Sequence, residues 1–74
     1  MPPAKPLPYR EVARKLTAAG FAKVSQKGSH VKFAKQTGLG IRTAIVPRHR
    51  GIAVGTLPSI LRQAGLTPDE FELL

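Results

Sequence analysis

The chain has 74 residues, no cysteine and twelve Lys and Arg residues against four acidic ones, giving a formal net charge of +8 at pH 7. This length allows a single domain. The lack of cysteine excludes disulfides and thiolate metal sites. Because four carboxylates offer few ligands for a metal ion, we expect neither metal nor cofactor. The positive charge favours a polyanionic partner, nucleic acid first and an acidic protein second. No apolar run approaches the roughly 20 residues of a membrane span, and the start lacks an apolar signal-peptide stretch, so we expect a cytoplasmic protein without membrane contact.

The N-terminal part predicts a lead-in followed by a helix. Residues 1–7 contain three prolines and are expected to form a flexible segment. Pro8 suits the first turn of a helix, where its missing N–H costs nothing. The apolar residues then recur with helical spacing, at Tyr9, Val12, Ala13 and Leu16. Glu11 and Lys15 predict an i,i+4 ion pair on the polar side, and Gly20 is expected to end the helix.

The middle of the chain alternates with a period of two, which is typical of strands. The predicted strands cover residues 22–27, 30–34 and 41–46. Gly28-Ser29 and residues 36–40 supply the turns between them, and Pro47 closes the last strand. Because the connections are short, the strands should form an antiparallel meander.

A second helix is predicted after a loop. Thr56 is placed to cap it, Pro58 lies in its first turn and Gly65 should stop it. Its apolar stripe consists of Leu57, Ile60, Leu61 and Ala64. Thr67-Pro68-Asp69-Glu70 is a capping-box pattern that should open a short terminal turn carrying Phe71.

The predicted fold is therefore α+β, with the order α-β-β-β-α, a three-stranded antiparallel sheet and two helices packed on one face, as one domain over residues 8–74. The apolar sheet residues expected under the helices are Val24, Val31, Phe33, Ile41 and Ile45. Alternation then predicts that the opposite, solvated face carries Lys23, Ser25, Lys27, His30, Lys32 and Arg42.

A histidine among cations suits RNA cleavage, which needs proton transfer and stabilisation of a charged phosphorane. His30 is the first candidate for the catalytic residue. The sequence pattern alone supports equally well a solvent-exposed histidine that has no function. For His49, a capping or phosphate contact in a loop is favoured over catalysis. The expected RNA contacts are Lys23, Lys27, Ser29, Lys32, Arg42, Arg48 and His49. Arg50 is a further candidate cation, Arg10 and Arg14 could extend the phosphate contacts, and Tyr9 is expected to pack in the core.

Three segments, in order along the chain, resemble a known family. Lys27-Gly28-Ser29-His30, Val46-Pro47-Arg48-His49 and the helix from Gly55 to Leu66 are similar to the motifs of HicA-like mRNA interferase toxins. The resemblance implies a double-stranded-RNA-binding-like fold and ribosome-independent mRNA cleavage, with His30 as the catalytic residue. It also implies a HicB-type antitoxin that covers this histidine and often represses the operon, so that DNA is contacted only through the antitoxin complex.

The sequence leaves two other classes of function open. The first is a non-catalytic RNA-binding module, because double-stranded-RNA-binding folds usually recognise shape without cutting. The second is a basic protein whose charged face docks an acidic partner protein. Neither needs a histidine on the charged face, so we favour a metal-independent ribonuclease that uses the 2′-hydroxyl as nucleophile and His30 as general acid or base.

Overall fold

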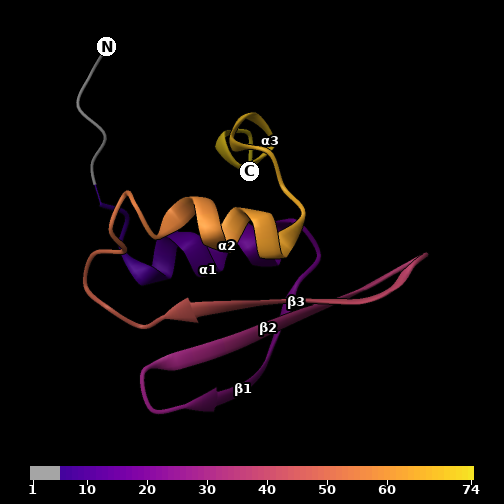
Figure 1. Ribbon diagram of the computed structural model, residues 1–74, viewed down its shortest axis with the longest axis horizontal. Coiled ribbons are helices and arrows are strands. Elements are labelled where there is room, and N and C mark those ends of the chain that lie inside the picture. Colours follow the sequence, from indigo (N-terminus) through magenta and orange to yellow (C-terminus); the bar gives the residue numbers. More distant parts are fainter. Residues whose placement is uncertain (1–5) are drawn as a thin grey trace.

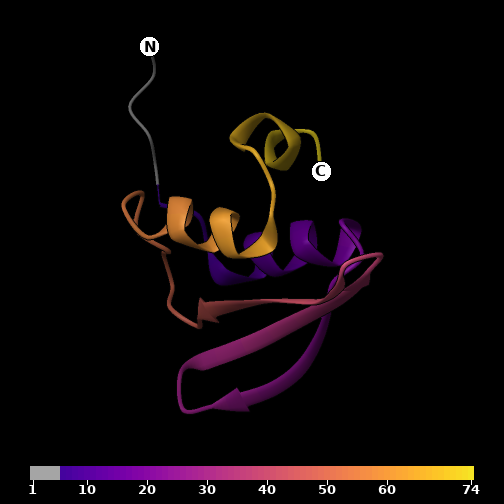
Figure 2. The same ribbon diagram turned by 45° about the vertical axis from the view of Figure 1, so that its right-hand side comes forward.

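The computed structural model describes residues 6–74 and has two main helices on one face of a three-stranded sheet (Figure 1). The elements in chain order are α1 (Tyr9–Ala18), β1 (Ala22–Lys27), β2 (His30–Thr37), β3 (Gly40–Pro47), α2 (Leu57–Ala64) and α3 (Pro68–Glu72). The sheet is antiparallel in the order β1-β2-β3. The predicted fold class is therefore confirmed, and α3 adds a short helix on the side of α1 and α2 that faces away from the sheet (Figure 2).

Helix α1 forms where the apolar stripe predicted it, with Val12 and Leu16 fully buried. Gly20 has a φ of 100°, a conformation that only glycine adopts without strain, and it turns the chain toward the sheet. The predicted pair between Glu11 and Lys15 is wrong, because Glu11 binds Arg14 instead. Lys15 points inward, where its amine donates to the carbonyl of Phe71 at 2.9 Å and thereby ties α1 to α3.

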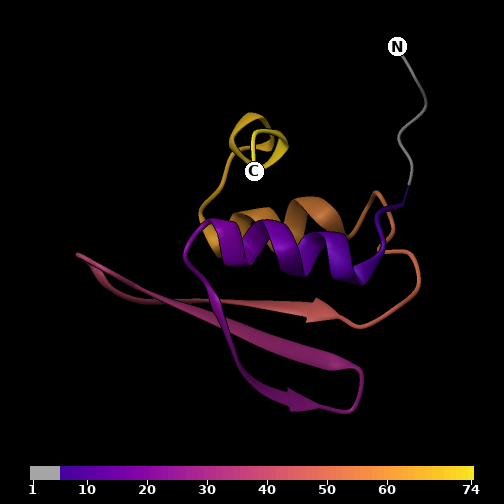
Figure 3. The ribbon, with the colours of Figure 1, turned by 180° about the vertical axis from the view of Figure 1, so that it is seen from behind.

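Helix α2 lies beside α1, as the view from behind shows (Figure 3). It buries Ile60, Leu61 and Ala64 in the core and ends at Gly65, whose φ is 71°. The side chain of Thr56 makes no capping hydrogen bond, so that part of the prediction is wrong.

Helix α3 begins at the predicted capping box. The Thr67 hydroxyl accepts from the backbone N–H of Glu70, and the Glu70 carboxylate accepts from the N–H of Thr67. That second bond stabilises the ionised carboxylate and lowers the pKa of Glu70 below its ordinary value. Phe71 is buried, as a residue that anchors a terminal helix should be.

The covered face of the sheet, meaning the face under α1 and α2, forms one side of the core. Val31 and Phe33 of β2 are buried beside their neighbours Val46 and Ala44 of β3. Placing four such side chains between the sheet and the helices removes them from water, and each buried methylene contributes about 0.8 kcal/mol. Strand β1 lies furthest from the helices, and all its residues are exposed (Figure 1).

Three apolar residues predicted on the covered face are exposed instead. Val24 is 56% exposed because a bulge between Lys23 and Ser25 leaves it out of the pairing with β2. Ile45 pairs with Lys32 and is 37% exposed, and Ile41 is 70% exposed near the hairpin that extends beyond the helices. The register places the even-numbered residues of β3 inward, so the prediction chose the wrong face of this strand.

The segment before α1 is paired rather than separate from the domain. Leu7 and Ile52 form an isolated antiparallel bridge, with N–O distances of 3.2 and 2.6 Å. This bridge joins the loop between β3 and α2 to the start of α1. Most of the lead-in predicted over residues 1–7 lies outside the described residues.

Candidate functional site

His30 is the first residue of β2 and directly follows the Gly28-Ser29 turn. Gly28 has a φ of 59°, which makes the tight turn between β1 and β2 possible. In the sheet, His30 lies between Lys27 of β1 and Pro47 of β3. Its side chain is exposed and alternates with the buried Val31, so it lies on the face away from the helices, as predicted.

The open face, meaning the sheet face opposite the helices, carries the predicted cations nearest to His30. Lys27 is its direct cross-strand neighbour, and Lys32 follows two positions along β2. Ser25 pairs with Lys32, so it also belongs to this face. All of these side chains are exposed and are available to a ligand.

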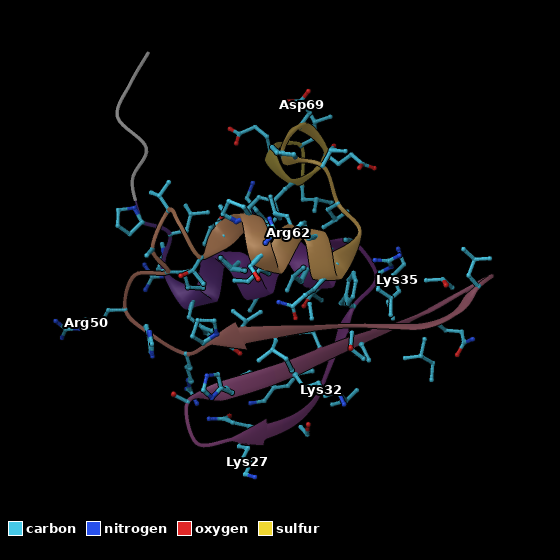
Figure 4. The ribbon with its side chains drawn as sticks, viewed as in Figure 1. Lys27, Lys32, Lys35, Arg50, Arg62 and Asp69 are labelled. Atoms are coloured by element: carbon cyan, nitrogen blue, oxygen red, sulfur yellow. The ribbon has the colours of Figure 1, made fainter. Side chains whose placement is uncertain are left out.

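The chain that leaves β3 brings a second group of cations to the same end of the sheet. The backbone N–H of Arg48 donates to the Ser29 carbonyl at 2.6 Å, which fixes this segment against the turn before His30. The N–H of His49 donates to the carbonyl of Pro47, and both Arg48 and His49 are exposed. Figure 4 shows Arg50 projecting outward at this end of the molecule. Two of the motifs that carried the family resemblance, Lys27-Gly28-Ser29-His30 and Val46-Pro47-Arg48-His49, thus meet at one end of the sheet.

Two predicted contact residues do not lie on the open face. Lys23 pairs with Phe33, because the bulge after it reverses the alternation of β1, and its amine donates to Gln26 at 3.1 Å. Arg42 lies on the helix side, where its guanidinium donates to the Gln63 carbonyl at 3.2 Å and packs against Gly65.

Arg42 is also remote from His30 along the sheet. It pairs with Lys35, five positions from His30, or about 17 Å at the rise of a strand. Figure 4 shows Lys35 far from Lys27 and Arg50. The structure therefore provides no site that would include both His30 and Arg42.

The carboxylates of the chain are engaged elsewhere or lie on another layer. Glu11 accepts from the Arg14 guanidinium, and this hydrogen bond lowers the pKa of Glu11 below its ordinary value. The other three acids lie on α3, beyond the helices (Figure 4, where Asp69 is labelled). Within residues 6–74, no three His, Asp or Glu side chains come together as metal ligands. Among residues 6–74, the acidic side chains therefore lie away from His30, whose neighbours on the open face are the cations Lys27 and Lys32.

Sequence reasoning missed that Tyr9 contributes to the surface near this end. Its ring lies beneath the Arg48 guanidinium, with 5.8 Å between the guanidinium carbon and the ring centroid. Together with Pro8, Arg10 and residues 48–50 it lines an open cleft of about 300 Å³. The run Arg48-His49-Arg50 was a signal of this cleft, but the approach of α1 is a tertiary contact that no local pattern contains.

Such a site can hold a phosphate with its cations and can move a proton with the imidazole of its histidine. The fold and site define a small, basic α+β protein that presents a histidine on a cationic sheet face. Comparison with protein families matches residues 9–66 to the HicA toxin of bacterial toxin–antitoxin systems. The match covers most of the chain, and the protein belongs to the HicA toxin family. It is the toxin component of a toxin–antitoxin system, and its partner is an antitoxin.

A comparison with curated proteins finds no match. Among residues 6–74, no helix has the length and apolar character needed to cross a membrane.

Proposed function

We propose that the protein is an endoribonuclease that cleaves mRNA in the cytoplasm, with His30 as the general acid or base. The main observation behind this proposal is the position of His30. It is exposed on the open face, beside Lys27 and two positions from Lys32. Membership of the HicA toxin family, whose members are generally ribonucleases, supports this reaction class.

The chemistry needs only groups of this kind and the RNA itself. As a general base, the neutral imidazole of His30 takes the proton from a ribose 2′-hydroxyl, whose oxygen attacks the adjacent phosphorus. The P–O5′ bond breaks, and the 5′-oxygen leaves with a proton from water or from a second acid. The products are a 2′,3′-cyclic phosphate and a free 5′-hydroxyl. A positioned acid–base group contributes on the order of 10²–10⁴-fold, which is sufficient for a slow nuclease.

Cations around His30 would stabilise the phosphorane. Lys27 and Lys32 flank the imidazole on the open face, and Ser29 and Arg48 lie in the adjoining turn and strand end. An ammonium group near the phosphate binds the substrate through its charge and also stabilises the extra negative charge of the phosphorane. We assign His49 a contact to RNA rather than a proton transfer.

The test uses purified protein and a labelled single-stranded RNA. We expect cleavage to continue in excess EDTA and to leave 2′,3′-cyclic phosphate ends. An RNA with 2′-O-methyl groups throughout should stay intact, since its nucleophile is blocked. Cleavage of the methylated RNA, or loss of cleavage in EDTA alone, would contradict this mechanism.

A non-catalytic RNA-binding module is the second candidate. It is favoured by one observation: among residues 6–74, His30 is the only histidine on the open face, whereas the cations alone suffice for binding. Under this alternative, RNA would be shifted in gels but remain intact after prolonged incubation. A basic protein that merely docks an acidic partner would instead bind RNA weakly and without specificity.

For the antitoxin we propose a HicB-like protein that covers His30 and the open face. The exposed Ile45, which pairs with Lys32, would give such a partner an apolar contact among the lysines. Any contact with operator DNA would then be made through the antitoxin complex.

A further inference from the structure

The structure has a second cationic surface, the arginine cleft, lined by Pro8, Tyr9, Arg10, Arg48, His49 and Arg50. We propose that this cleft binds backbone phosphates of the RNA next to the cleaved one, so that the strand passes the start of α1 on its way to His30. The inference rests on the proposed function in taking RNA as the ligand, and it adds Arg10 and Arg50 as binding residues and Tyr9 as a positioning residue.

The cleft is built from two segments that the fold holds together. One is the start of α1, and the other is the loop after β3. The Leu7–Ile52 bridge joins them on one side. On the other side, the hydrogen bond from Arg48 to Ser29 fixes the loop to the turn that precedes His30. Because both ends are tied, the arginines keep a defined position relative to the imidazole.

Arg48 is the residue that connects the cleft to the open face. It follows Pro47 directly, and Pro47 is the cross-strand neighbour of His30. The Tyr9 ring supports its guanidinium by a cation–π contact and restricts where it points. Tyr9 is itself fixed by the Phe33 ring, at 6.5 Å between centroids, so this support reaches down to the core.

The charge of the cleft favours a phosphate chain. Its lining holds three arginines and a histidine but no carboxylate. The one ion pair among residues 6–74 joins Arg14 to Glu11, so the cleft arginines are not neutralised within the part of the chain that the structure describes. Guanidinium groups bind phosphate oxygens through two parallel hydrogen bonds, and a groove of such groups follows the backbone without selecting bases.

An RNA strand explains why the cleft lies where it does. A strand that presents its 2′-hydroxyl to His30 must continue past the end of the sheet, and the cleft lies on the route beyond Pro47 and Arg48. Lys27 and Lys32 would contact the strand at the cut, next to His30, and the cleft would bind the phosphates beyond it. An acidic surface of the antitoxin is the competing occupant, and the experiment below separates the two.

The experiment measures binding of a fluorescent single-stranded RNA by anisotropy, with His30→Ala in every protein so that no RNA is cut. Arg10→Gln and Arg50→Gln should each weaken binding about 3–10-fold and lower the slope of log affinity against log salt by about 1. Arg62→Gln is the matched control, because Arg62 is an exposed arginine on α2 outside the cleft (Figure 4). It should change the affinity less than twofold, by long-range charge alone.

Tyr9→Leu tests the positioning role, since it removes the ring face beneath Arg48. It should weaken RNA binding as much as Arg48→Gln does, and adding it to Arg48→Gln should have little further effect. Thermal unfolding of each variant is measured alongside, and the comparison uses temperatures at which all variants are folded.

Equal losses for Arg10→Gln and Arg62→Gln would overturn the proposal. So would a loss of antitoxin affinity with unchanged RNA affinity, which would make the cleft a protein interface. Because the assay measures binding, its result is independent of cleavage. An RNA that binds through the cleft but stays intact with the wild-type protein would contradict the proposed ribonuclease activity and would still support the cleft as an RNA-binding site.

Discussion

The two faces of the sheet differ in what one substitution can do. Along β2, Val31 and Phe33 point to the covered face and are buried, whereas His30 and Lys32 point to the open face and are exposed. Residues one step apart in the sequence thus serve packing on one side and the candidate site on the other. The comparison teaches that stability and activity should separate residue by residue on this strand.

Charged residues on the two faces have different tasks as well. Arg42 on the covered side binds the end of α2, while Lys32 on the open side is exposed. The alternation of residues in the sequence predicts an RNA contact for both Arg42 and Lys32. The structure separates them by face and by distance along the sheet.

The largest expected effect on stability comes from Phe33→Ala. It removes a buried ring from the covered face and should lower the free energy of unfolding by about 3–5 kcal/mol, a large part of the stability of a domain of this size. Urea denaturation followed by circular dichroism measures it. Lys32→Ala is the neighbouring control and should change the free energy by less than about 0.5 kcal/mol; similar losses for both would break the distinction between the faces.

Lys32→Gln should impair RNA cleavage without affecting the fold. Losing one phosphate contact is expected to raise KM about 3–10-fold at moderate salt, and the difference should shrink as salt increases. Steady-state cleavage of a short RNA at two salt concentrations measures this. An unchanged KM at low salt would remove Lys32 from the site.

Arg42→Gln is the matched comparison for Lys32→Gln, because it also removes one positive charge but from the covered side of the sheet. The lost hydrogen bond and helix C-terminal interaction should destabilise the protein by about 1 kcal/mol. KM for RNA should stay within about twofold of wild type, since the residue lies about 17 Å along the sheet from His30. A KM change as large as that of Lys32→Gln would show that RNA reaches the helix side.

The smallest expected effect on stability concerns helix α3. The pKa of Glu70 is lowered in the folded protein, so its contribution to stability is present above the pKa of the unfolded chain and is lost as the pH falls through the folded value. Glu70→Gln should therefore destabilise the protein slightly at neutral pH and converge with wild type once the pH has fallen below the pKa of Glu70 in the folded protein. Urea unfolding at several pH values tests this, with Glu72→Gln as the control for net charge. A gap between wild type and Glu70→Gln that persists in acid would contradict it.

The elements of this fold could be predicted because their signals are local. Apolar spacing fixed both main helices, Gly28 and Gly65 marked a turn and a helix end, and Thr67 marked the start of α3. The exposure of His30 also followed from alternation, since the buried Val31 is its neighbour.

The errors arose where the result depends on pairing between segments. No local sequence signal predicts the bulge after Lys23, which leaves Val24 exposed and places Lys23 on the helix side. In β3, isoleucines occupy odd positions and Ala44 and Val46 even ones, so hydrophobicity alone chose the wrong face. The arginine cleft was missed for the same reason, because it joins residues about 40 positions apart in the sequence.

The most direct test of the account compares wild type with His30→Ala on the same preparation, measuring RNA cleavage and urea unfolding. The account predicts a loss of cleavage of about 10²–10⁴-fold with a free energy of unfolding within about 0.5 kcal/mol of wild type. Cleavage that persists in His30→Ala, or a loss of cleavage that merely follows unfolding, would contradict the claim that this exposed imidazole performs the reaction.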